Sequence, residues 1–134
     1  MSTVGHPSLY RVAVQRNFIA RHYLVGGNWG VENQLHAHHY DVELILEGEM
    51  LDRHGYLVDI ADVETALEEI VGRFKDKVLN ELPEFEGLNP SIENFSRILW
   101  HGMADRINAP NLGAMQVKIW ENEIAWASFR RDLR

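Results

Sequence analysis

Two stretches in the first third of the chain alternate between apolar and polar side chains, the pattern of a β-strand with one buried face. On one face of the first stretch, residues 10–18, lie Tyr10, Val12, Val14 and Phe18. The second stretch covers residues 36–48. The glycine-rich segment 26–30 between them predicts a loop, and the segment 52–55 predicts a turn. We therefore expect the chain to begin with an antiparallel strand pair or meander.

The middle of the chain changes to the 3.6-residue period of amphipathic helices. Asp59 or Asp62 is suited to cap the first helix, because a carboxylate accepts backbone N–H bonds and complements the helix dipole. The stripe expected to be buried comprises Val63, Ala66, Leu67, Ile70, Val71, Phe74 and Val78. Residues 82–90 break the pattern, and Ser91 is a good N-cap for a second helix. Its expected buried side is Ile92, Phe95, Leu99, Met103 and Ile107.

The last part of the chain returns to strand patterning. Residues 115–120 and 124–129 flank Glu121-Asn122-Glu123, which has the spacing of a hairpin turn. The order of elements is ββααββ, which predicts the α+β class: an antiparallel four-stranded sheet with two helices on one face.

Composition and charge narrow the class of protein. With 134 residues, the simplest organisation is one domain over residues 1–134, with a short, poorly ordered lead-in at residues 1–8. A net charge of -7 argues against nucleic-acid and anionic-membrane partners. The sequence has no cysteine, which excludes disulfides, thiolate metal ligands and a cysteine nucleophile. Without an apolar run long enough to span a bilayer or a recognisable signal peptide, we expect a soluble cytoplasmic protein.

The second strand carries the clearest candidate chemistry. Side chains alternate along a strand, so His36 and His38 share a face and His39 points to the other. Two imidazoles so placed can bind one zinc ion, and a catalytic zinc needs a third protein ligand. His22, at the end of the preceding strand, is the candidate. A bare H-x-H motif is also common among structural and surface histidines.

Glu121 is the second candidate. It continues the alternation of the strand before it, which would turn its carboxylate inward to bind a pair of ligand N–H groups bidentately. The alternative is a turn residue in solvent.

Taken together, these motifs resemble the 6-pyruvoyltetrahydropterin synthase family, including its bacterial 6-carboxytetrahydropterin synthase branch, over nearly the whole chain. Residues 18–22 look like the F-x-A-x-H motif of the family, and 36–38 like its H-G-H, with Ala37 in place of glycine. The segments 55–63 and 117–121 are similar to the entry into the first helix and to the glutamate-bearing strand. Residues 89–94 resemble the pterin-pocket motif, with Ile92 where a hydroxyl residue is usual.

The resemblance implies a set of expectations. Zinc would be held by His22, His36 and His38, and a pterin-like substrate would be bound by Glu121, Ser91 and Glu93. The fold would be the tunnelling fold, in which three subunits close a twelve-stranded barrel and two trimers stack into a homohexamer with sites at subunit interfaces.

Departures from the family pattern concern proton transfer. The family has a cysteine base shortly before the H-x-H, whereas this chain carries Glu32 there. The Asp-His relay of the family corresponds here to Lys75-Asp76. A free glutamate, with a pKa of about 4.3, is a weaker base than a thiolate. Which of Glu32 and Asp76 transfers protons stays open at this point.

Two functions are compatible with this pattern. One is a zinc-dependent enzyme acting on a relative of 7,8-dihydroneopterin triphosphate with altered chemistry, and the other is a non-catalytic pterin-binding paralogue. Under both, ordinary synthase activity is expected to be weak or absent.

Overall fold

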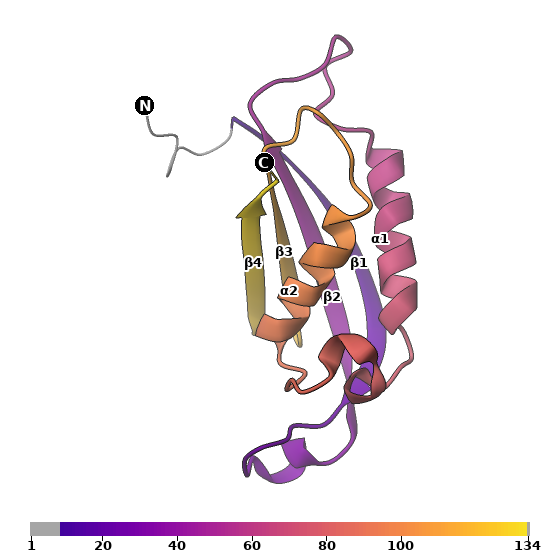
Figure 1. Cartoon of the computed structure of the whole chain (residues 1–134), viewed down its shortest axis with the longest axis vertical. Helices are drawn as coiled ribbons and strands as arrows, with labels where there is room; N and C mark the ends of the chain where they lie inside the picture. Colours follow the sequence, from indigo (N-terminus) through magenta and orange to yellow (C-terminus); the bar gives the residue numbers. More distant parts are fainter. Residues whose placement is uncertain (1–8, 134) are drawn as a thin grey trace.

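A computed structural model describes residues 9–133 of the chain, so the lead-in predicted over residues 1–8 lies outside the described residues. Four strands form one antiparallel sheet in the order β1-β2-β3-β4, and two α-helices cover one of its faces (Figure 1). The predicted α+β class and ββααββ order are therefore confirmed. No helix within residues 9–133 is long and apolar enough to cross a membrane.

The strands follow the predicted alternation closely. They are β1 (Tyr10–His22), β2 (His36–Gly48), β3 (Ala114–Trp120) and β4 (Trp126–Asp132). β1 is longer than the 10–18 pattern because the alternation of its buried face continues through Ala20 to His22, which are 0% and 2% exposed. Its last residue, His22, lies directly opposite His36, the first residue of β2.

Helix α1 (Ile60–Phe74) begins at the predicted cap, Asp59, whose carboxylate accepts the N–H of Ala61. The predicted stripe is buried as far as Phe74 but does not reach Val78. The helix ends earlier because Asp76 adopts a left-handed backbone conformation, φ 61°. Val78 instead forms a parallel β-bridge with Arg21, against the outer side of β1.

Helix α2 (Ile92–Ala104) begins at Ser91, whose hydroxyl accepts the N–H of Asn94 as predicted for an N-cap. Ile107, expected on its buried stripe, follows the end of the helix and is only half-buried. α1 packs on β1 and α2 packs on β3 and β4. The core between the helices and the sheet centres on Phe95, whose ring contacts four others: Phe18, Tyr40, Phe74 and Phe85.

The β3–β4 hairpin differs from its prediction at one end. Ile124 was expected in the last strand, but it is 90% exposed and lies in the turn. The carboxamide oxygen of Asn122 accepts the N–H groups of Ile124 and Ala125, and this extends the turn so that β4 begins only at Trp126.

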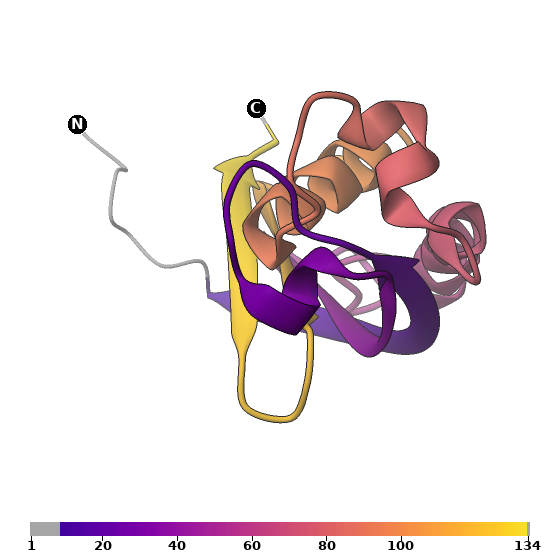
Figure 2. The same ribbon diagram turned by 90° about the horizontal axis from the view of Figure 1, so that it is seen from below.

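Three short 3-10 turns gather at the end of the molecule where β1 finishes and β2 starts. They are η1 (Gly30–Asn33), η2 (Leu79–Glu81) and η3 (Pro83–Phe85). Viewed along the long axis from this end, the loop with η1 lies over the end of the sheet and beside the segment with η2 and η3 (Figure 2). The histidines His22 and His36 lie at this end.

Candidate functional site

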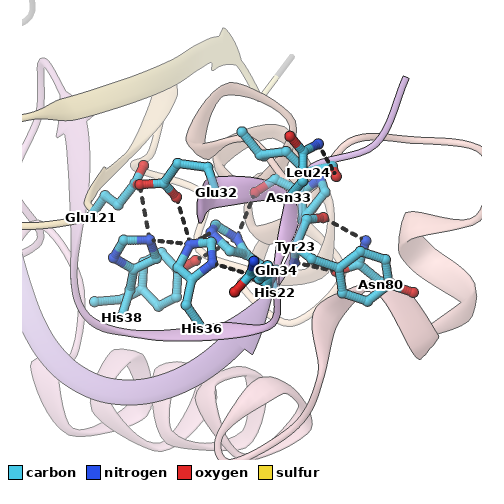
Figure 3. A network of polar contacts seen from close by, with 12 residues as sticks. His22, Tyr23, Leu24, Glu32, Asn33, Gln34, His36, His38, Asn80 and Glu121 are labelled. Carbon is cyan, nitrogen blue, oxygen red and sulfur yellow. Dashed lines mark hydrogen bonds and ion pairs between the residues drawn. The ribbon is translucent and has the colours of Figure 1, made fainter. Parts of the chain in front are cut away.

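Three imidazoles from the β1–β2 hairpin converge on one point. The Nε2 atom of His36 lies 3.0 Å from Nε2 of His22 and 3.1 Å from Nε2 of His38 (Figure 3). The convergence follows from the register, because His22 pairs with His36 and the strand period brings His38 to the same face. His39 points to the other face, where its ring nitrogen contacts Asn17.

The opposite ring nitrogens are held by backbone carbonyls. Nδ1 of His22 lies 3.1 Å from the Pro90 oxygen, and Nδ1 of His36 lies 2.7 Å from the Gln34 oxygen. A carbonyl can only accept, so in both rings Nδ1 carries the hydrogen. Nε2 is therefore the ring nitrogen that each of the two imidazoles turns toward the common point. This is the arrangement in which outer contacts orient histidines that bind a metal.

The donor set fits a cation better than it fits a proton. A proton on Nε2 of His36 can point at only one neighbour, so the other close contacts of that nitrogen would have no hydrogen bond between them. In a tetrahedral zinc site with Zn–N near 2.0–2.1 Å, the nitrogens would be about 3.3 Å apart. The observed separations of 3.0 and 3.1 Å lie within a few tenths of an ångström of that value. His22, His36 and His38 could hold zinc with small adjustments.

Two carboxylates face the same cluster. Glu32 of η1 places its Oε2 atom 2.7 Å from Nε2 of His36, and Glu121 in the β3–β4 turn places Oε1 3.0 Å from Nε2 of His38. Glu121 thus points inward, the orientation that its place in the alternation of β3 allowed. The two carboxylates give the site acceptors for the N–H or O–H groups of a ligand.

Burial controls the protonation of the innermost groups. The pKa of His22 is lowered to about 4. Burial is the main cause, and electrostatic interaction with His38 and His36 adds to it. Tyr40 is fully buried behind it with its hydroxyl 3.1 Å from Nδ1 of His22, and burial raises the pKa of that hydroxyl. Near neutral pH, His22 is therefore a neutral imidazole with its Nε2 lone pair available for a cation.

Asparagine side chains fix the loop between the two strands. The Asn80 amide accepts the N–H of Tyr23 and donates to the oxygen of the same residue, at 3.0 and 2.9 Å. Asn89 forms the same pair of bonds with Val25, both at 2.8 Å. Sequence reasoning did not give Asn80 or Asn89 this role, because an asparagine in a loop carries no periodicity and its partner lies 57 or 64 residues away.

The remaining predicted residues lie outside the contacts of the histidine cluster. The Ser91 hydroxyl caps α2, one residue after the carbonyl that holds His22. Glu93 is exposed on the first turn of α2, and within residues 9–133 its carboxylate makes no hydrogen bond or ion pair. Asp76 is exposed at the end of α1, and its N–H donates to the Ile19 oxygen.

Comparison with known proteins gives the family. The sequence model of the family described as 6-pyruvoyl tetrahydropterin synthase matches residues 11–132. The chain belongs to this family. A relative from Archaeoglobus fulgidus, provisionally named a 6-carboxy-5,6,7,8-tetrahydropterin synthase, is 27% identical over 120 residues, covering 90% of this chain and 95% of its own.

Solved structures of family members share the fold. The 6-pyruvoyl tetrahydropterin synthase of Caenorhabditis elegans matches with a TM-score of 0.77 and 19% identity, over 92% of this chain and 98% of its own. A Plasmodium vivax 6-pyruvoyltetrahydropterin synthase matches with the same TM-score and the same coverage of both chains, at 15% identity, as a variant in which a catalytic glutamate is replaced by alanine. The fold is therefore the tunnelling fold, and the relatives of this chain take part in pterin biosynthesis.

Proposed function

We propose that this chain is a zinc-dependent enzyme of the lyase type that acts on a pterin-like substrate related to 7,8-dihydroneopterin triphosphate, with weak or absent ordinary synthase activity. The observation that supports it most strongly is the convergence of three Nε2 atoms with the carboxylates of Glu32 and Glu121 at one point. Family membership supplies the substrate class.

Each polar side chain of the site has a role in this proposal. A zinc ion held by His22, His36 and His38 would supply Lewis acidity toward the hydroxyls of a bound substrate. Glu32 accepts the proton that leaves the substrate, because its carboxylate already lies against the histidines. Glu121 binds the ring N–H groups of the substrate bidentately.

The pterin contacts of Ser91 and Glu93 are also part of the proposal. Neither side chain contacts the histidines within one subunit. We therefore place them at a subunit interface of a homohexamer, a dimer of trimers in which β1 of one subunit pairs with β4 of the next to close a twelve-stranded barrel. Both are edge strands of the isolated sheet, whose main-chain groups such pairing would satisfy. Light scattering after gel filtration tests this assembly.

The altered proton-transfer residues support a changed reaction. The family relay positions are Lys75-Asp76. Among the described residues, the candidate bases beside the histidines are carboxylates, those of Glu32 and Glu121. In the Plasmodium vivax relative a glutamate is a catalytic residue, which supports a catalytic role for Glu32.

The test is turnover of 7,8-dihydroneopterin triphosphate and other dihydropterins by zinc-saturated protein, with products identified by mass spectrometry. We expect a product other than 6-pyruvoyl- or 6-carboxy-tetrahydropterin, and a loss of about 10²-fold or more in rate for Glu32→Ala. Glu123→Ala, in the exposed turn, is the matched control. Absence of turnover, with Glu32→Ala indistinguishable from the parent, contradicts the enzymatic proposal.

A non-catalytic pterin-binding paralogue is the second candidate. It is favoured by the joint loss of the cysteine and of the Asp-His relay. Calorimetry with pterins and guanine-like compounds separates the two, since this candidate predicts binding without turnover, and binding that Glu121→Gln weakens. Absence of any pterin binding removes it.

A further inference from the structure

The histidine cluster has four potential ligand atoms rather than three. The ligating atoms of His22, His36, His38 and Glu32 all lie within 4.8 Å of one another. Glu121 approaches the cluster too, at 3.0 Å from His38, yet it does not belong to this set among the described residues. A tetrahedral site requires its fourth ligand near all three others, which favours Glu32 over Glu121 for this position.

The loop holds the Glu32 backbone in a fixed position. The Glu32 oxygen accepts the N–H of Leu24 at 2.9 Å, and its N–H donates to the Trp29 oxygen. The neighbouring Asn33 amide donates to the oxygens of Leu24 and Gly27. The 3-10 turn η1 thereby aims the carboxylate at His36 before any ligand arrives (Figure 3).

The Glu32 side chain itself keeps freedom to move. It is 46% exposed, and within residues 9–133 the only close polar contact of its carboxylate is with Nε2 of His36. A fixed backbone with a half-exposed side chain permits two positions, one against the cluster and one in solvent. Removing the charge is therefore expected to leave the fold intact.

We propose that Glu32 is the fourth metal ligand, so that the chain closes its own metal site with a three-histidine, one-carboxylate set until a substrate arrives. This rests on the metal site of the proposed function. It assigns Glu32 a resting position that differs from its role as a base, and it distinguishes Glu32 from Glu121, which binds no metal. A carboxylate that leaves the cluster when substrate enters remains close enough to accept a proton.

The experiment measures metal binding without any substrate. Zinc affinity is determined by competition with a chromophoric chelator, and the coordination of Co²⁺ by its visible absorption spectrum, for the full chain and for Glu32→Gln, Glu121→Gln and Glu123→Gln. We expect Glu32→Gln to weaken zinc binding at least about tenfold and to change the Co²⁺ bands. The other two variants should bind zinc within about threefold of the parent, with unchanged spectra.

Three outcomes overturn the inference in distinguishable ways. Parent-like affinity and spectrum in Glu32→Gln refute the fourth ligand while leaving the three-histidine site of the proposed function intact. A larger loss of zinc affinity in Glu121→Gln than in Glu32→Gln shows that Glu121, and not Glu32, is the fourth ligand. Failure of the parent chain to bind zinc, or equal binding by His36→Asn, overturns this inference and the proposed function together. Circular dichroism of each metal-free variant confirms that the fold is retained.

Discussion

The Asn80 amide joins the segment after α1 to the residue that follows the metal-ligand candidate His22, so its removal is a direct test of how the site is held. In Asn80→Ala, both main-chain groups of Tyr23 lose their partner, across bonds of 3.0 and 2.9 Å. Each bond contributes about 0.5–1.5 kcal/mol net, and both are part-buried, so the expected loss in unfolding free energy is about 2 kcal/mol. This corresponds to a fall in Tm of roughly 6–10 °C.

Asn122→Ala is the matched control, because it also removes two hydrogen bonds between an asparagine side chain and the backbone. The Asn122 carboxamide oxygen accepts the N–H groups of Ile124 and Ala125. Those bonds are exposed in the β3–β4 turn, where water replaces the lost oxygen, so we expect a loss below about 1 kcal/mol. Urea unfolding of both variants at one protein concentration gives the comparison. Equal losses, or an Asn80→Ala variant as stable as the parent, would refute the reasoning that part-burial makes the Asn80 bonds the stronger ones.

Further predictions concern pH, metal and packing. The pKa of His22 is lowered from 6.5 to about 4 in the folded chain, so the unfolded state binds the proton first as pH falls. The free energy of unfolding of the metal-free protein should therefore fall by up to about 3 kcal/mol between pH 6.5 and about 4. Urea midpoints should fall with pH in the parent and less steeply in His22→Gln. Zinc at a hundred times its Kd should raise the free energy of unfolding by about 2.7 kcal/mol, and a chelator should reverse the gain. A Tm that does not change with zinc would contradict the metal site. Gly48→Ala should lower the free energy of unfolding by about 1–3 kcal/mol, because its Cβ would clash with the Asn111 oxygen. Gly72→Ala in α1 meets nothing within 4 Å and should raise that free energy by up to about 1 kcal/mol. Thermal unfolding of the pair decides, and equal effects would contradict the contact.

The sequence predicts most of the fold because burial imposes a period on it. Val14 and Phe18 on β1, and the stripe of α1, follow this rule and are buried. The errors lie at element ends, where periodicity gives no signal. The left-handed backbone of Asp76 ends α1 before Val78, and the Asn122 side chain extends the turn beyond Ile124.

The candidate site was predictable where strand geometry decides it. The period of two and the hairpin register bring His22, His36 and His38 together. The approach of Glu32 to His36 depends instead on a 3-10 turn in a loop. It also depends on hydrogen bonds that the Asn33 side-chain amide donates, and no local pattern reveals their acceptors. The carbonyls that orient the imidazoles, from Pro90 and Gln34, lie in loops as well.

The three histidines of the cluster lie on the β1–β2 hairpin, and this has a consequence for how the chain folds. His22 and His36 are only 14 residues apart in sequence, and His36 and His38 only two. The loop that must close to bring the imidazoles together is short, so we expect its closure to cost little entropy and to precede the docking of α1 and α2. If the cluster holds a metal as proposed, an ion present during refolding would bind a partly folded chain and accelerate the first strand pairing, rather than only stabilise the finished protein.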